Sequence, residues 1–176
     1  MKSIGRRTVK WTLGGLALFL IAGYTVKVWA NPATGVTATL IGRGTYKKFQ
    51  IVANPASDPT NPLSEPIFQY AAQAQPAIDM IVQTHNYVPG ASTGWHTHPG
   101  PVYITVTQGA LAFYEVDDPT CSPHVVTAGQ GYLDTGHGHI GLNQTGNPAQ
   151  DVTIAVAPVG AAFRSELPAP GPYCSF

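Results

Sequence analysis

The sequence is poor in charge, and this shortage limits what the protein can bind. Charged residues make up only 10% of its 176 residues. After residue 30, four basic side chains remain against nine acidic ones, which gives that part a net charge of −5. A negative domain argues against a nucleic-acid partner, because such partners need a basic surface. We therefore interpret Arg43, Lys47 and Lys48 as one solvated strand face.

The sequence also lacks an apolar run of membrane-spanning length. The uncharged, largely apolar run near the N-terminus covers residues 11–26 and falls short of the ~20 residues that a spanning helix needs. Basic residues precede this run, and Val28-Trp29-Ala30 follows it with side chains suited to cleavage after Ala30. That order predicts a signal peptide over residues 1–30. A signal anchor, with membrane attachment through residues 11–26, and a buried helix remain alternatives.

Cysteine is scarce, with only Cys121 and Cys174 in the chain. Two such distant cysteines do not form a cysteine-based metal site. An isolated pair in an exported, periplasmic or extracellular protein instead predicts a disulfide. This bond would tie the C-terminal tail to a loop of the preceding domain.

Short β-branched and apolar segments alternate with turns rich in glycine and proline. No helical period is strong, so the pattern predicts an all-β sandwich or barrel. Within residues 78–88, Ile78, Met80 and Val82 share one face and His85 lies on the other. The expected strands cover residues 36–41, 46–52, 78–88, 102–109, 111–116, 125–126, 132–133 and 152–156.

Five prolines interrupt residues 54–77. Because proline at this density breaks regular structure, we expect a long surface loop with room for a short helix at 67–74. A long loop in a compact domain serves as a lid or binding loop, or it is an inert edge crossing. The sequence leaves both open.

Histidines two residues apart form the strongest candidate site. His96 and His98 lie on one face of an extended segment, so both imidazoles can reach one metal ion. Downstream, His139 offers a third nitrogen ligand, although His137 competes with it by the same spacing. His85 reads as a core residue or a lining residue of the interior, and His124 as an exposed one.

These two stretches resemble the paired motifs of the cupin family, and together they cover roughly a third of the chain. The residues that fit are Gly90, His96, His98 and Gly109 in the first motif, and Gly136, His139 and Asn143 in the second. The residues that depart are Ala128 and Asp134 at the glycine and proline positions of the second motif, and Val102 at the glutamate position of the first, or Tyr103 in its longer variant.

The resemblance implies a jelly-roll β-barrel over residues 31–176, with its core at about 78–158 and its site inside. It also implies a divalent ion (Fe, Mn, Zn or Ni) held by His96, His98 and His139. Since Val102 replaces the glutamate, this set would be three neutral nitrogens with open coordination positions. Asp134 is another candidate oxygen donor.

The leading function that follows is metal-dependent chemistry on a small molecule outside the cytoplasm, most readily of the oxygenase type. The alternatives are a non-catalytic exported protein that binds a small ligand in the same barrel, and an envelope-associated module whose loops bind a partner. A homodimer remains open.

Overall fold

The computed structural model describes residues 32–58, 60–66, 68–174 and 176. These residues form fourteen strands and one short 3₁₀ helix, so the expected all-β class is confirmed. The strands are β1 (Thr34–Tyr46), β2 (Phe49–Ala53), β3 (Ala56–Asp58), β4 (Asn61–Pro66), β5 (Tyr70–Ala74), β6 (Ile78–Ser92), β7 (His96–Thr97), β8 (Val102–Gln108), β9 (Ala110–Glu115), β10 (His124–Thr127), β11 (Gly131–Asp134), β12 (His139–Leu142), β13 (Ala149–Pro158) and β14 (Ser165–Glu166), and the helix is Pro172–Cys174.

The expected signal peptide or anchor of residues 1–30 lies outside the described residues. In the part of the chain that is described, no helix has the length and apolar character that crossing a membrane requires.

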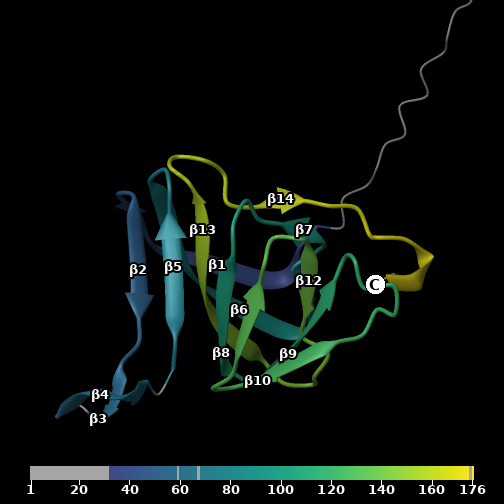
Figure 1. Ribbon diagram of the computed structural model, residues 1–176. Helices are drawn as coiled ribbons and strands as arrows, with labels where there is room; N and C mark the ends of the chain where they lie inside the picture. Colours follow the sequence, from purple (N-terminus) through teal and green to yellow (C-terminus); the bar gives the residue numbers. More distant parts are fainter. Residues whose placement is uncertain (1–31, 59, 67, 175) are drawn as a thin grey trace, which may run out of the picture.

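The main sheet folds into two groups of strands that enclose the core (Figure 1). One group runs β1-β6-β13-β8-β11, and the other runs β10-β9-β12-β7-β14. Strand β6 links them, because its last residue, Ser92, pairs with Leu142 of β12. On the opposite side, a hydrogen bond links the turn after β10 to β8: the Gly129 N–H donates to the Val106 carbonyl at 2.9 Å. The result is a nearly closed jelly-roll barrel.

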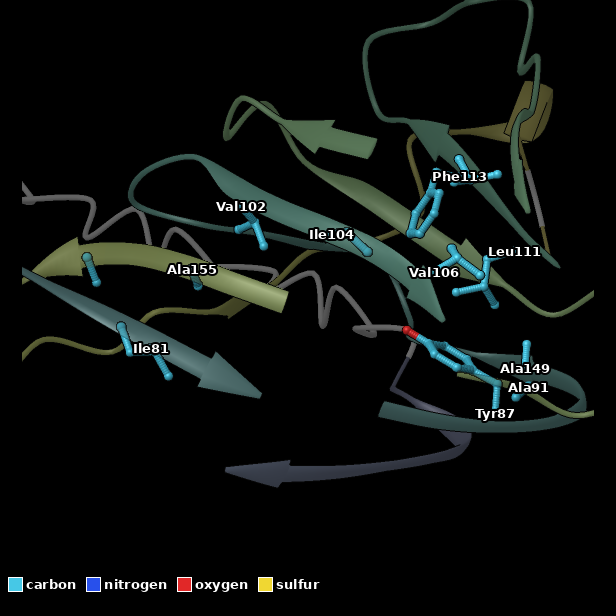
Figure 2. Packing of buried hydrophobic residues seen from close by; sticks show 12 residues of the cluster. Ile81, Tyr87, Ala91, Val102, Ile104, Val106, Leu111, Phe113, Ala149 and Ala155 are labelled. Carbon is cyan, nitrogen blue, oxygen red and sulfur yellow. The ribbon is translucent and has the colours of Figure 1, made fainter. Parts of the chain in front are cut away.

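Strict alternation decides which side chains enter the barrel. Val102, Ile104 and Val106 of β8 are buried, whereas the residues between them are exposed. Ile81 of β6 and Phe113 of β9 complete the same cluster from facing strands (Figure 2). Full burial of each large side chain stabilises the fold by about 1.5–3 kcal/mol.

On β6, the shared face predicted for Ile78, Met80 and Val82 turns outward. The buried residues of this strand are the odd-numbered ones, such as Asp79 and Ile81. His85 has the same parity, so it lies on the inner face. Its predicted separation from Ile78, Met80 and Val82 is thereby confirmed.

The proline-rich segment is not the loop that the sequence predicted, and the short helix at 67–74 is wrong. Residues 70–74 form β5, which pairs with β2 along its whole length, and β3 pairs with β4. Strand pairing with the apolar run of β2 outweighs the helical preference of the alanines in β5. This hairpin lies beside the barrel (Figure 1). Its described residues do not line the central cavity.

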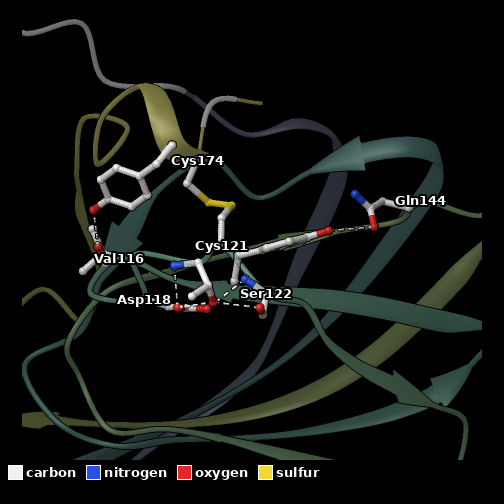
Figure 3. The surroundings of a disulfide bond; sticks show 9 residues. Val116, Asp118, Cys121, Ser122, Gln144 and Cys174 are labelled. Carbon is white, nitrogen blue, oxygen red and sulfur yellow. Dashed lines mark hydrogen bonds between the residues drawn. A yellow bond between two sulfur atoms is a disulfide. The ribbon is translucent and has the colours of Figure 1, made fainter.

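The predicted disulfide between Cys121 and Cys174 is present (Figure 3). It joins the loop after β9 to the C-terminal 3₁₀ helix, with 5.3 Å between the two Cα atoms. Cys174 is buried against a second apolar cluster that contains Trp95 and Ile140. The tail is therefore fixed both by a covalent bond and by packing.

Reduction of this disulfide should destabilise the protein by about 4 kcal/mol, because the bond closes a long loop in the unfolded chain. Urea unfolding with and without reductant measures the difference, and a Cys121→Ser, Cys174→Ser double variant should match the reduced wild type. Thiol titration of the unreduced, denatured protein should find no free thiol; two free thiols would contradict the bond.

Candidate metal centre

Two short strands bring the predicted ligands together. His96 opens β7 and His139 opens β12, and the two residues are paired across the antiparallel ladder. His98 lies just beyond β7, in the turn that leads to β8. The three side chains each offer one ligand atom, and these atoms lie within 4.8 Å of one another. Their ring centroids are 4.4 to 5.6 Å apart. The structure thus positions His96, His98 and His139 to hold one metal ion.

Each imidazole is oriented by a polar contact at its Nδ1 atom. His96 Nδ1 donates to the Gly94 carbonyl at 2.8 Å, and His98 Nδ1 donates to the Phe163 carbonyl at 2.5 Å. His139 Nδ1 lies 3.4 Å from a carboxylate oxygen of Asp134. A carbonyl or carboxylate holds the proton on the nitrogen that it contacts, so Nε2 is left as the ligand atom.

The surroundings of His96 and His98 favour their neutral forms. Burial lowers the pKa of His98 to about 4, although the hydrogen bond that His98 donates to the Phe163 carbonyl acts to raise it. Burial lowers the pKa of His96 still further, and the neighbouring His139 acts in the same direction. Metal ligation requires neutral imidazole, so the residues present fit a divalent ion.

The turn before β12 requires glycine on both sides of His137. Gly136 and Gly138 have φ angles of +94° and +109°, which side-chain-bearing residues rarely adopt. A Cβ at Gly138 would also lie 2.7 Å from a methyl carbon of Leu167. These two glycines direct His139 inward and leave His137 outside.

Val102, the residue at the glutamate position of the cupin-like motif, faces the interior of the barrel. Its side chain is buried and lines the same cavity as the three histidines. Tyr103 points outward and is 41% exposed, so the longer motif variant does not apply. Asp134 is fully buried, and its contact with Nδ1 of His139 makes it a support for a ligand rather than a fourth ligand. Burial raises the pKa of Asp134, but the contacts with His139 and the Gly136 N–H outweigh this and lower it.

The remaining histidines lie outside the three-histidine set. His137 is 66% exposed and contacts Asp117 at the surface. His124 is exposed at the start of β10, as predicted. His85 lines the cavity, where its Nδ1 lies 2.7 Å from Asp151.

The cavity has a volume of about 200 Å³ and mostly apolar walls. Sequence reasoning missed several of its polar residues, namely Gln83, Tyr87, Asp151 and Arg164. Parity along β6 could have found the first two, since they share a face with His85. Asp151 is a charged residue on the buried face of β13, and such a residue indicates a functional or paired position. Nothing local marks Arg164, because the C-terminal segment carries it to the site.

The two sequence motifs also lie next to each other in the structure. The N–H of Gly90, which opens the first motif, donates to the carbonyl of Asn143, which closes the second, at 2.9 Å. Between these ends, His96 and His139 pair across two strands inside a jelly-roll barrel. The fold is a jelly-roll barrel in which the two cupin-like motifs lie together, with valine at the glutamate position of the first motif.

No family model matches the chain, and no curated protein matches it. Among solved structures, it is similar to an uncharacterized conserved protein with a double-stranded β-helix domain from Klebsiella pneumoniae (22% identity, TM-score 0.43, covering 49% of this chain and 73% of that one). It is also similar to the polyketide cyclase RemF from Streptomyces resistomycificus, with 19% identity and a TM-score of 0.39 over 47% of this chain and 62% of that one. A third similar structure is a predicted oxalate decarboxylase from Thermotoga maritima, with 17% identity and a TM-score of 0.38 over 47% of this chain and 82% of that one. At these identities, none of the three assigns an activity.

The metal-free protein should lose stability as the pH falls from about 6.5 towards 4. In this window the unfolded chain protonates His98 at its ordinary pKa of about 6.5, while folded His98 stays neutral, so acid favours unfolding. Thermal melting at several pH values measures the slope. The variant His98→Gln should have a shallower slope, and an identical slope would contradict the depressed pKa.

Proposed function

We propose that this protein is an exported cupin that binds one divalent metal ion through His96, His98 and His139 and acts on a small molecule. The observation that carries the proposal is the convergence of three imidazoles, each with its Nδ1 turned towards a carbonyl or carboxylate oxygen. Such an arrangement fixes both the tautomer and the ring orientation before any ion arrives.

The chemistry that we propose is of the oxygenase type. A divalent ion with only three neutral protein ligands supplies Lewis acidity and open positions for water, dioxygen or substrate. The protein's own contribution is to orient the ligands, to exclude bulk water through the apolar cavity walls and to admit only small molecules. Val102 adds an apolar wall where a carboxylate would otherwise neutralise charge.

Export is supported by sequence features and by the disulfide. Basic residues, an apolar run and a cleavage-like site follow one another over residues 1–30. The disulfide between Cys121 and Cys174 is typical of proteins in oxidising compartments. Mass spectrometry of the N-terminus tests the cleavage, for which we expect a mature chain that begins near Asn31.

The metal site is tested by the variant His98→Ala, which should lose most of the bound metal. The matched control is His137→Ala, which removes an exposed histidine only two residues from His139. Elemental analysis of both variants and of the wild type should give one ion per chain in the wild type and the control. Equal metal content in His98→Ala and the wild type would refute the site.

The variant Val102→Glu should bind the metal more tightly than the wild type, because Val102 faces the cavity and glutamate adds a negative oxygen ligand. Without metal, the same variant should melt at a lower temperature, since it buries an unpaired carboxylate. The control Tyr103→Glu places its charge on the outer face and should leave the metal affinity unchanged. Unchanged metal affinity in Val102→Glu would contradict its position beside the ion.

A further inference from the structure

A second polar cluster faces the cavity, and metal binding does not use it. His85 and Tyr87 lie two residues apart on the inner face of β6, and Asp151 lies opposite His85 on β13. His85 Nδ1 is 2.7 Å from one oxygen of Asp151, and the Tyr87 hydroxyl donates to the other at 2.7 Å. The register between β13 and β8 shifts at Asp151, which is the kind of irregularity that redirects a side chain.

The protons of this cluster can be assigned from its chemistry. Burial and the nearby Asp151 raise the pKa of Tyr87 far above its ordinary value, so its phenol stays protonated and donates. An ionised Asp151 can only accept, so His85 Nδ1 must carry the proton that lies between them. His85 Nε2 then keeps a lone pair, since the hydrogen bond of this ring to the described residues is made at Nδ1.

Other charged groups do not compete for this lone pair. Arg164 also lines the cavity, but its guanidinium donates to Glu166 and to the Thr93 carbonyl. Asp151 is 1% exposed, so its negative charge acts at short range in a low dielectric. The cluster is therefore a base, His85, supported by a buried anion that would stabilise its protonated form.

The cavity walls define the matching ligand. The larger apolar side chains that line the cavity are Val36, Val102, Ile104, Phe113 and Phe163. A cavity of about 200 Å³ is of the size that admits a single small ring. A site with apolar walls and an unpaired acceptor at His85 selects molecules that carry a matching donor.

We propose that the cavity binds a small, largely apolar molecule with a weakly acidic hydroxyl group, and that His85 accepts the proton of that hydroxyl. The ligand's O–H bond breaks, an N–H bond forms at Nε2, and the electron pair stays on the ligand oxygen. The imidazolium is stabilised by Asp151, with Tyr87 holding Asp151 in place. The inference deepens the proposed function by naming its substrate class, and it rests on that proposal only for the use of this cavity.

The test uses para-nitrophenol, whose phenolate has a visible absorption band, and para-nitrotoluene, which is similar in size but has no acidic hydroxyl. Both are titrated into the full-length protein, as purified and after chelator treatment. Bound para-nitrophenol should appear as phenolate at a pH where the free phenol is mostly neutral. It should also bind at least about tenfold more tightly than para-nitrotoluene. Equal affinity for the two probes, or no binding of para-nitrophenol, would overturn the proposal.

Variants assign the proton acceptor. His85→Phe should abolish the phenolate band and the preference for para-nitrophenol, and Asp151→Asn should weaken the band without abolishing binding. Thr153→Val is the matched control, because Thr153 also lines the cavity but is not part of the cluster, and it should behave as the wild type. A full band in His85→Phe would refute the role of His85. If His85→Phe does not fold, His85→Gln provides the same measurement.

One further comparison separates this inference from the proposed metal site. His98→Ala should lose the metal but keep the phenolate band, because its acceptor is intact. Conversely, His85→Phe should keep the metal content of the wild type. Loss of the band in His98→Ala, together with its retention in His85→Phe, would assign the proton to the metal histidines and overturn the inference.

Discussion

The pairing of β7 with β12 is the constraint on which the site depends. Without it, His96 and His139 would belong to segments more than forty residues apart with no reason to meet. The pairing is short, so it is reinforced at its ends. The Gly90 N–H bonds to the Asn143 carbonyl on one side, and β14 adds a further strand beside β7 on the other. This short ladder thus fixes the separation of the His96 and His139 imidazoles.

The orientation of the rings follows from polar contacts that come from different parts of the chain. His96 is held by its own local turn through the Gly94 carbonyl, so its geometry is set over two residues. His139 contacts Asp134, five residues earlier, across the glycine turn. His98 depends on the Phe163 carbonyl from the distant C-terminal segment. A bound ion would therefore link a local, a near and a remote part of the chain through a single set of ligands.

Sequence reasoning succeeded where a periodicity of two or a motif carried the information. The parity of His85 and the disulfide pairing were both predicted correctly. It failed at residues 67–74, where strand pairing with β2 outweighs the local preference. It also missed Asp151 and Arg164, because their positions beside His85 and the three histidines depend on strand register and on a tail that crosses the barrel. No window of sequence contains those relations.

The contact between His98 and Phe163 has a consequence for the order in which the protein is made. The two residues are 65 positions apart, and Phe163 lies close to the C-terminus. During synthesis or translocation from the N-terminal end, both motifs emerge before the carbonyl that orients His98. The ligand set is therefore completed only once nearly the whole chain is available. A chain that ends before Phe163 would lack the carbonyl that orients His98.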